Sequence, residues 1–151
     1  MCGRVRLTYE APPGNWLFRG VRHAEIDAGY RLIPKAQRPF LDDAQLPLTF
    51  PLSFGPSVEH AVRNHQRDSD LNQTRGVSTM PHFERAVHYA RCGVVVRIDV
   101  EAASRLGILL HRVADHVPPQ GRTHPEDDEV ILVSPVDGEF PAEIIAEVIR
   151  V

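Results

Sequence analysis

Three short segments of this chain carry residue types suited to binding a phosphate and to stabilising a cation. Arg19 stands beside Gly20 after an apolar run, and an arginine offers a planar fork of donors that suits a diphosphate. Ser78 and Thr79 stand where an expected strand leads into an expected helix. Glu129 directly precedes four apolar residues, so we expect its carboxylate at the mouth of a buried strand, where it can stabilise a developing positive charge.

In order along the chain, these segments resemble the arginine-serine-glutamate class of ADP-ribosyltransferases. That family carries an aromatic residue followed by Arg-Gly on its first core strand, a Ser-Thr strand that leads into a helix, and an acidic-x-Glu sequence before a late strand. The matching segments here are residues 17–21 (LFRGV), 76–80 (GVSTM) and 127–132 (DDEVIL). Each motif is weak on its own, and the specificity comes from their order and spacing across most of the chain.

The resemblance implies an enzyme that uses NAD as its substrate. Arg19, Gly20, Ser78 and Thr79 would bind the NAD, and Glu129 would act as the catalytic carboxylate together with Arg19, Ser78 and Thr79. Cleavage of the nicotinamide–ribose bond expels a neutral pyridine and leaves an oxocarbenium-like ribose, which a carboxylate stabilises. The ADP-ribose would then pass to an acceptor that the sequence does not identify: a protein, a nucleic acid, a small molecule or water.

Two positions depart from the pattern of this family. The residue two places before the catalytic glutamate is often Glu or Gln in the family and serves the acceptor side, whereas it is Asp127 here. Because Asp is shorter by one methylene, modification of arginine in particular is not implied. The third residue of the Ser-Thr motif is Met80 instead of a hydroxyl residue.

Each candidate residue also has a structural explanation. Glu129 ends an acidic run and suits a solvated charge, and Arg19 suits an arginine that extends over the surface of a strand edge, with Arg31 as a competing cation. Ser78 and Thr79 suit helix capping. A second hypothesis is therefore a non-catalytic module that binds a nucleotide or a partner on the same fold.

A third hypothesis starts from the N-terminus. The opening Met-Cys-Gly-Arg resembles the start of the SOS-response-associated peptidases, in which the cysteine exposed after removal of Met traps abasic DNA, and Cys2 would be that residue here. The match ends after four residues. A solvent-facing terminal cysteine is the simpler interpretation.

Composition and charge are those of an ordinary globular domain. The chain has 151 residues, of which 42% are hydrophobic and 25% charged, and its net charge is −3, so we expect no general affinity for DNA. With no membrane-spanning or signal segment, we expect a cytoplasmic protein, for which leaderless export as a toxin or effector stays open. Two cysteines and histidines without metal-ligand spacing predict no metal site, although His82 or His88 could contact substrate.

The elements that must position these residues alternate irregularly between strand and helix. This pattern favours an α+β fold, a single compact domain over residues 1–151, and the resemblance implies a split β-sandwich core with short helices. Periodicity predicts strands at residues 5–9, 16–21, 30–33, 76–79, 94–100, 108–113 and 130–133, of which 16–21 and 94–100 are expected to be central. It predicts helices at residues 22–28, 57–65 and 101–106 and one opened by Pro81, with a proline-rich connection at 34–56 and an apolar tail at 144–151.

Overall fold

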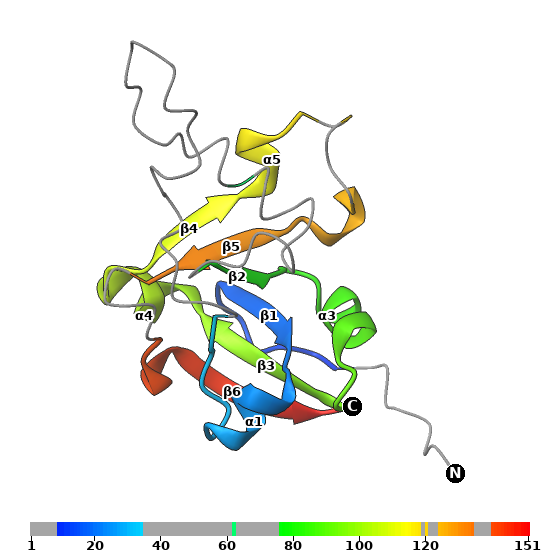
Figure 1. Cartoon of the computed structure of the whole chain (residues 1–151), viewed down its shortest axis with the longest axis vertical. Helices are drawn as coiled ribbons and strands as arrows, with labels where there is room; N and C mark the ends of the chain where they lie inside the picture. Colours follow the sequence, from blue (N-terminus) through cyan, green and yellow to red (C-terminus); the bar gives the residue numbers. More distant parts are fainter. Residues whose placement is uncertain (1–8, 35–61, 63–75, 119, 121–123, 135–139) are drawn as a thin grey trace, which may run out of the picture.

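Two three-stranded antiparallel sheets form the framework of the protein (Figure 1). The computed structural model describes residues 9–34, 62, 76–118, 120, 124–134 and 140–151. The first sheet has the order β1-β3-β6, from strands β1 (Trp16–Gly20), β3 (Val94–Asp99) and β6 (Ile145–Arg150). The second has the order β2-β5-β4, from β2 (Gly76–Thr79), β5 (Val130–Val133) and β4 (Leu109–Arg112).

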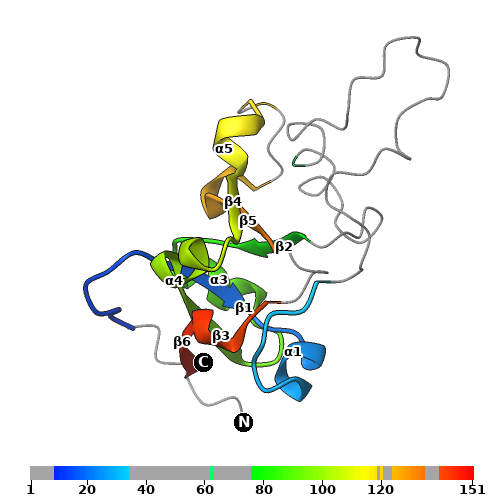
Figure 2. The same cartoon turned by 90° about the vertical axis from the view of Figure 1, so that its left-hand side faces the viewer.

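Short helices connect the strands and cover their ends (Figures 1 and 2). They are α1 (His23–Asp27), α3 (Phe83–Tyr89), α4 (Val100–Arg105) and α5 (Val113–His116), with the 3-10 turns η3 (Pro125–Asp127) and η4 (Ala142–Ile144). The chain therefore has the predicted α+β fold. No helix in the described ranges combines the length and apolar character that a membrane crossing requires.

The two sheets are joined where β1 meets the end of β2. Phe18 donates its backbone N–H to the Met80 carbonyl at 2.7 Å, and Met80 donates to the Phe18 carbonyl at 2.9 Å. This bridge holds Arg19, the next residue of β1, close to Ser78 and Thr79 on β2. One backbone contact thus brings together two of the three segments that the sequence singles out.

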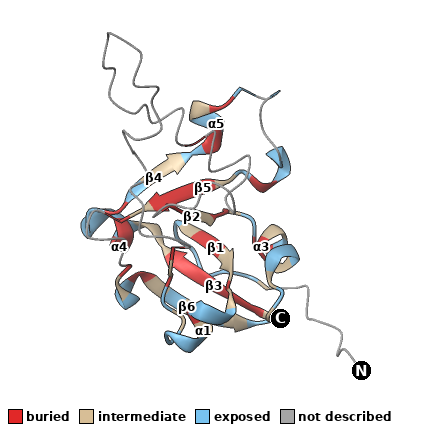
Figure 3. Cartoon of the chain, viewed as in Figure 1, coloured by how far each residue is buried: buried red, intermediate tan, exposed pale blue. Residues whose placement is uncertain are grey.

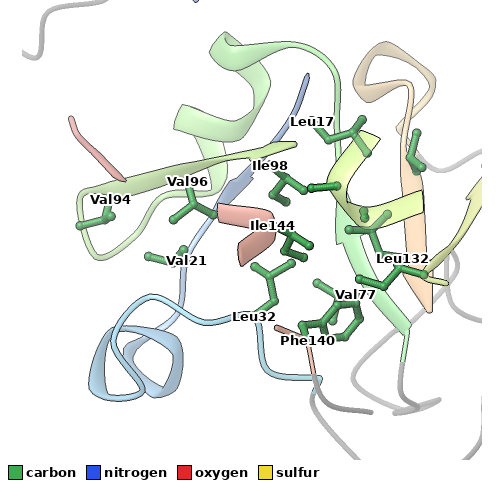
Figure 4. Packing of buried hydrophobic residues seen from close by; sticks show 14 residues of the cluster. Leu17, Val21, Leu32, Val77, Val94, Val96, Ile98, Leu132, Phe140 and Ile144 are labelled. Carbon is green, nitrogen blue, oxygen red and sulfur yellow. The ribbon is translucent and has the colours of Figure 1, made fainter. Parts of the chain in front are cut away.

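Apolar side chains from both sheets meet in one core (Figure 4). Val96 and Ile98 come from β3, whereas Val77 and Leu132 come from β2 and β5, and all are buried. Phe140 packs in the same cluster with no exposed surface. Burial is concentrated along the central strands β3 and β5 (Figure 3), and each fully buried side chain of this size contributes about 1.5–3 kcal/mol of transfer free energy.

Most of the predicted elements within the described residues are present. The strand predicted at 94–100 is β3, which is central in its sheet, and that at 130–133 is β5. The helix predicted at 22–28 is α1, followed by Gly29 at a φ of +75°. Helix α3 follows the Ser-Thr strand, but Pro81 lies before its N-cap residue, His82, and not in its first turn.

Two expectations about these elements were wrong, and one helix was missed. Strand β1 lies at the edge of its sheet, because β3 separates it from β6. Residues 30–33 form no strand: the N–H of Ile33 donates to the buried Glu25 carboxylate at 3.1 Å, so a side chain takes the place of a strand partner. Helix α5 was not predicted, because it lies in a short polar stretch without clear periodicity.

Other expectations fall largely outside the described residues. These are the strand at 5–9, of which only Tyr9 is described, the connection at 34–56 after Pro34, the helix at 57–65 and the role of Cys2. Within the expected helix, Val62 is described: it is helical and completely buried, in a cluster with Val113, Val117 and Ile131.

Candidate active site

The structure brings the side chains of Ser78 and Glu129 into direct contact. Ser78 Oγ donates a hydrogen bond of 2.9 Å to Glu129 Oε2. Strands β2 and β5 make this possible, because Ser78 pairs with Ile131 and Thr79 with Val130 in the antiparallel ladder. Glu129 precedes β5 by one residue and is partly buried, as expected for a residue at the mouth of a buried strand.

Arg19 reaches the same place from β1. Its Nη1 atom donates to the backbone carbonyl of Ser78 at 2.8 Å, and its Nε atom donates to Glu25, at 3.0 Å to Oε2. These contacts use two of the five N–H donors of a guanidinium. The side chain is only 12% exposed, so it lies in the cluster and does not extend over the surface. Arg19, Ser78 and Glu129 therefore converge at one point of the fold.

Glu25 is the residue of this site that the sequence analysis missed. It lies on α1 with no exposed surface, and it accepts hydrogen bonds from the backbone N–H of Arg22 at 3.0 Å and of Ile33 at 3.1 Å, besides those from Arg19. The N–H of Arg22 on the glutamate three residues later is half of a capping box, and that spacing was the available signal. With Arg22 Nε at 3.6 Å, two guanidinium groups lie against one buried carboxylate.

The electrostatic environment of Glu129 favours its protonated form. Burial raises the pKa of the Glu129 carboxyl above its ordinary value, and the negative charge of Asp127 raises it further. The Ser78 hydrogen bond and the positive charges of His124 and Arg19 lower this pKa and partly offset the increase. A carboxyl group whose pKa is shifted in this way, close to an arginine, is typical of functional sites. Structural ion pairs shift pKa values as well.

The Thr79 side chain lies on the opposite face of β2 from the Ser78 side chain. Side chains alternate across a strand, and Thr79 is completely buried, with its hydroxyl donating to the Val130 carbonyl at 2.7 Å. In this structure Thr79 ties β2 to β5 and has no surface with which to contact NAD. We therefore assign it a structural role, where the resemblance implied a cofactor contact.

Gly20 is required for the packing of α3. A Cβ atom at this position would lie 2.6 Å from the Ala90 nitrogen, 2.7 Å from the Tyr89 carbonyl carbon and 2.8 Å from the Ala86 oxygen. All three are backbone atoms, so they cannot move aside easily. The space beside Gly20, where the resemblance implied NAD binding, is occupied by the end of α3.

Asp127 is also engaged within the protein. Both of its carboxylate oxygens accept hydrogen bonds from α3, one from Arg85 and one from Tyr89. Of the two histidines that could contact substrate, His82 pairs with Asp128 at 2.6 Å and His88 is exposed beside Tyr89. Arg31, the competing arginine, is exposed after α1, and in the described part of the chain it contacts neither Ser78 nor Glu129.

Comparison with models of known protein families and with curated proteins finds no match for this chain. The described residues contain no group of three or more His, Cys, Asp or Glu side chains placed to hold a metal ion.

Proposed function

We propose that this chain is an ADP-ribosyltransferase-type enzyme that cleaves the nicotinamide–ribose bond of NAD and passes the ADP-ribose to an acceptor or to water. The observation that carries the proposal is the convergence on Ser78: its hydroxyl holds Glu129, and its carbonyl holds Arg19. Three segments that are distant in the sequence thus supply a carboxylate, a hydroxyl and a cation in one cluster. The resemblance assigns the same three residue types to NAD cleavage.

Glu129 would supply the stabilisation of the transition state. The bond between ribose C1′ and the nicotinamide nitrogen breaks, its electron pair neutralises the pyridinium, and the ribose becomes an oxocarbenium-like cation. The Glu129 carboxylate, oriented by Ser78, would stabilise that cation, and partial burial strengthens the interaction. A nucleophile on the acceptor then bonds to C1′ and loses its proton.

Arg19 would bind the diphosphate of NAD. The Glu25 carboxylate fixes the Nε edge of the guanidinium, so the group is oriented before the ligand arrives. Arg22 adds a second positive charge beside the Glu25 carboxylate. An oriented guanidinium binds a phosphate with less loss of side-chain entropy than a lysine does.

The test is release of nicotinamide from NAD by the purified full-length chain, with Glu129→Gln as the inactive variant. We expect Glu129→Gln to lower kcat by about a hundredfold or more, as found for removal of a single stabilising group at other active sites, while NAD binding measured by calorimetry is retained. Glu84→Gln is the matched control, because it makes the same change at an exposed position of α3. NAD binding without release of nicotinamide by the unmodified chain would overturn the proposal in favour of a nucleotide-binding module.

A further inference from the structure

Asp127 differs from the acidic residues beside it in its burial. Its side chain is 7% exposed, whereas those of Glu126 and Asp128 are 53% and 58% exposed. A carboxylate that contacts an acceptor on another molecule has to be accessible from solvent. Asp127 faces the interior of the protein instead, so its partners there determine what it does.

Those partners are two residues on one face of α3. Arg85 Nε donates to Asp127 Oδ1 at 2.6 Å, and the Tyr89 hydroxyl donates to Oδ2 at 2.6 Å. The donors lie four residues apart on the helix, which places both side chains on the same face. Burial and the hydrogen bond to Asp127 raise the pKa of Tyr89 to about 12, so the hydroxyl remains a hydrogen-bond donor to Asp127 even at alkaline pH. The pKa of Arg85 is raised as well, chiefly by its hydrogen bond to Asp127.

Helix α3 is in turn fixed on the strand that carries Arg19. Phe83 and Ala86 are buried against Phe18 and Val95, and the backbone of α3 approaches Gly20 closely. The helix also follows directly from the strand that carries Ser78. The Asp127 carboxylate, which is hydrogen-bonded to α3, is therefore held in a fixed position relative to Arg19 and Ser78.

Asp127 is connected to Glu129 by one residue in a restricted conformation. Asp128 has a φ of 50° and a ψ of 46°, the left-handed region that non-glycine residues rarely adopt and that Asp tolerates better than most. The carbonyl of Glu129 accepts a hydrogen bond of 3.0 Å from the N–H of Val113. The turn is thus fixed on both sides of Asp128, which sets the direction from which the Glu129 side chain approaches Ser78.

We propose that Asp127, held by Arg85 and Tyr89, is a positioning residue for Glu129 and takes no part in selecting the acceptor. This inference rests on the proposed NAD cleavage, and it replaces the acceptor-side role that the resemblance implies for Asp127. Anchoring α3 to the turn η3 keeps Glu129 at hydrogen-bond distance from Ser78. The negative charge of Asp127 acts on the Glu129 carboxyl at the same time, together with Arg19, His124 and the Ser78 hydroxyl.

The test compares Asp127→Asn and Tyr89→Phe with the unmodified chain and with Glu84→Gln, a change at an exposed position of α3. In both variants we expect kcat for nicotinamide release to fall on the order of tenfold to a hundredfold with KM changed less than about threefold, because the carboxylate is misplaced and NAD contacts are kept. We expect the fraction of ADP-ribose passed to an added guanidino compound, relative to water, to stay unchanged. A changed fraction with unchanged total release of nicotinamide would show an acceptor-side role and overturn the proposal.

A second measurement does not depend on NAD. Carbon-13 NMR titration of the Glu129 carboxyl gives its pKa directly, and circular dichroism confirms that each variant is folded. Tyr89→Phe removes one of the two anchors of Asp127 and changes no charge, so displacement of Glu129 from the Ser78 hydroxyl should raise the Glu129 pKa, whereas Glu84→Gln leaves it within about 0.2 of the unmodified value. An unchanged pKa in Tyr89→Phe would show that Glu129 keeps its place beside Ser78 without this anchor, and would overturn the proposal. Absence of nicotinamide release from the unmodified chain, with the pKa shift present, would instead reject the proposed function.

Discussion

Ser78 Oγ and Glu129 Oε2 lie 2.9 Å apart, although 51 residues separate the two positions in the sequence. The hydroxyl donates to the carboxylate and so stabilises its ionised form, against the burial that favours the protonated form. This hydrogen bond joins a side chain of β2 to the residue that precedes β5, and it lowers the pKa of the Glu129 carboxyl. Removal of the Ser78 hydroxyl should therefore raise the pKa of the Glu129 carboxyl.

Replacement of Ser78 by Ala should move the acid limb of the pH–activity profile to higher pH. Activity requires the Glu129 carboxylate, whose pKa burial already raises above the ordinary value for glutamate, and loss of the Ser78 donor raises it further. We expect the profile of kcat against pH to show this shift, with activity at high pH reduced less than activity at low pH. A profile that is scaled down uniformly, without a shift, would separate Ser78 from the ionisation of Glu129.

Glu129→Gln should make the protein more resistant to unfolding at neutral pH. Because the pKa of Glu129 is raised in the folded state, its stabilising contribution is complete below the pKa of the unfolded chain and is lost as pH rises through the folded-state pKa. The amide carries no charge and avoids this loss. Urea unfolding at several pH values should therefore show a stability advantage of the variant that grows from acidic to neutral pH. An advantage that is constant with pH would contradict the raised pKa.

Glu25→Gln should destabilise the fold and weaken NAD binding together. Removal of one partner from a buried ion pair typically costs about 3–5 kcal/mol, and Glu25 is the buried partner of Arg19, whereas Arg22 is partly exposed. The amide retains one acceptor oxygen, so the orientation of Arg19 is lost only in part. We expect a lower urea midpoint by fluorescence and a higher Kd for NAD by calorimetry. Glu84→Gln, an exposed change on α3, is the control and should alter neither.

Gly20→Ala should separate α3 from β1 and reduce both stability and activity. The added Cβ would lie 2.6–2.8 Å from three backbone atoms at the end of α3, closer than packed atoms tolerate, and overpacking of this kind typically costs about 1–3 kcal/mol. Since α3 carries Arg85 and Tyr89, its displacement should also move Asp127. Gly29→Ala on the loop after α1 serves as the comparison: no atom lies within 4 Å of its added Cβ, so its effect reports only the cost of its positive φ. A Gly20→Ala variant as stable as the unmodified chain would contradict the close packing.

The sequence by itself determined the strongest elements and the residue types of the candidate site. Strands β3 and β5 were predictable because their apolar, β-branched runs reflect burial on both faces, and α1 because a glycine stop follows it. These are local signals, and each is carried by a few consecutive residues. The placement of Glu129 at the mouth of β5 was predictable for the same reason.

Only the tertiary structure decided which side chains contact one another. The burial of Glu25 against Arg19, the anchoring of Asp127 on α3 and the approach of α3 to Gly20 all join segments through space. Hydrophobic periodicity does not predict such contacts, because the sequence does not distinguish a buried carboxylate from a solvated one. Residues 30–33 (YRLI) show the converse, since this strand-like segment forms no strand and its Ile33 N–H is bound by the Glu25 side chain. Local sequence patterns determine where helices and strands form. The hydrogen-bond and ion-pair partners available in the folded chain determine the role of each polar residue.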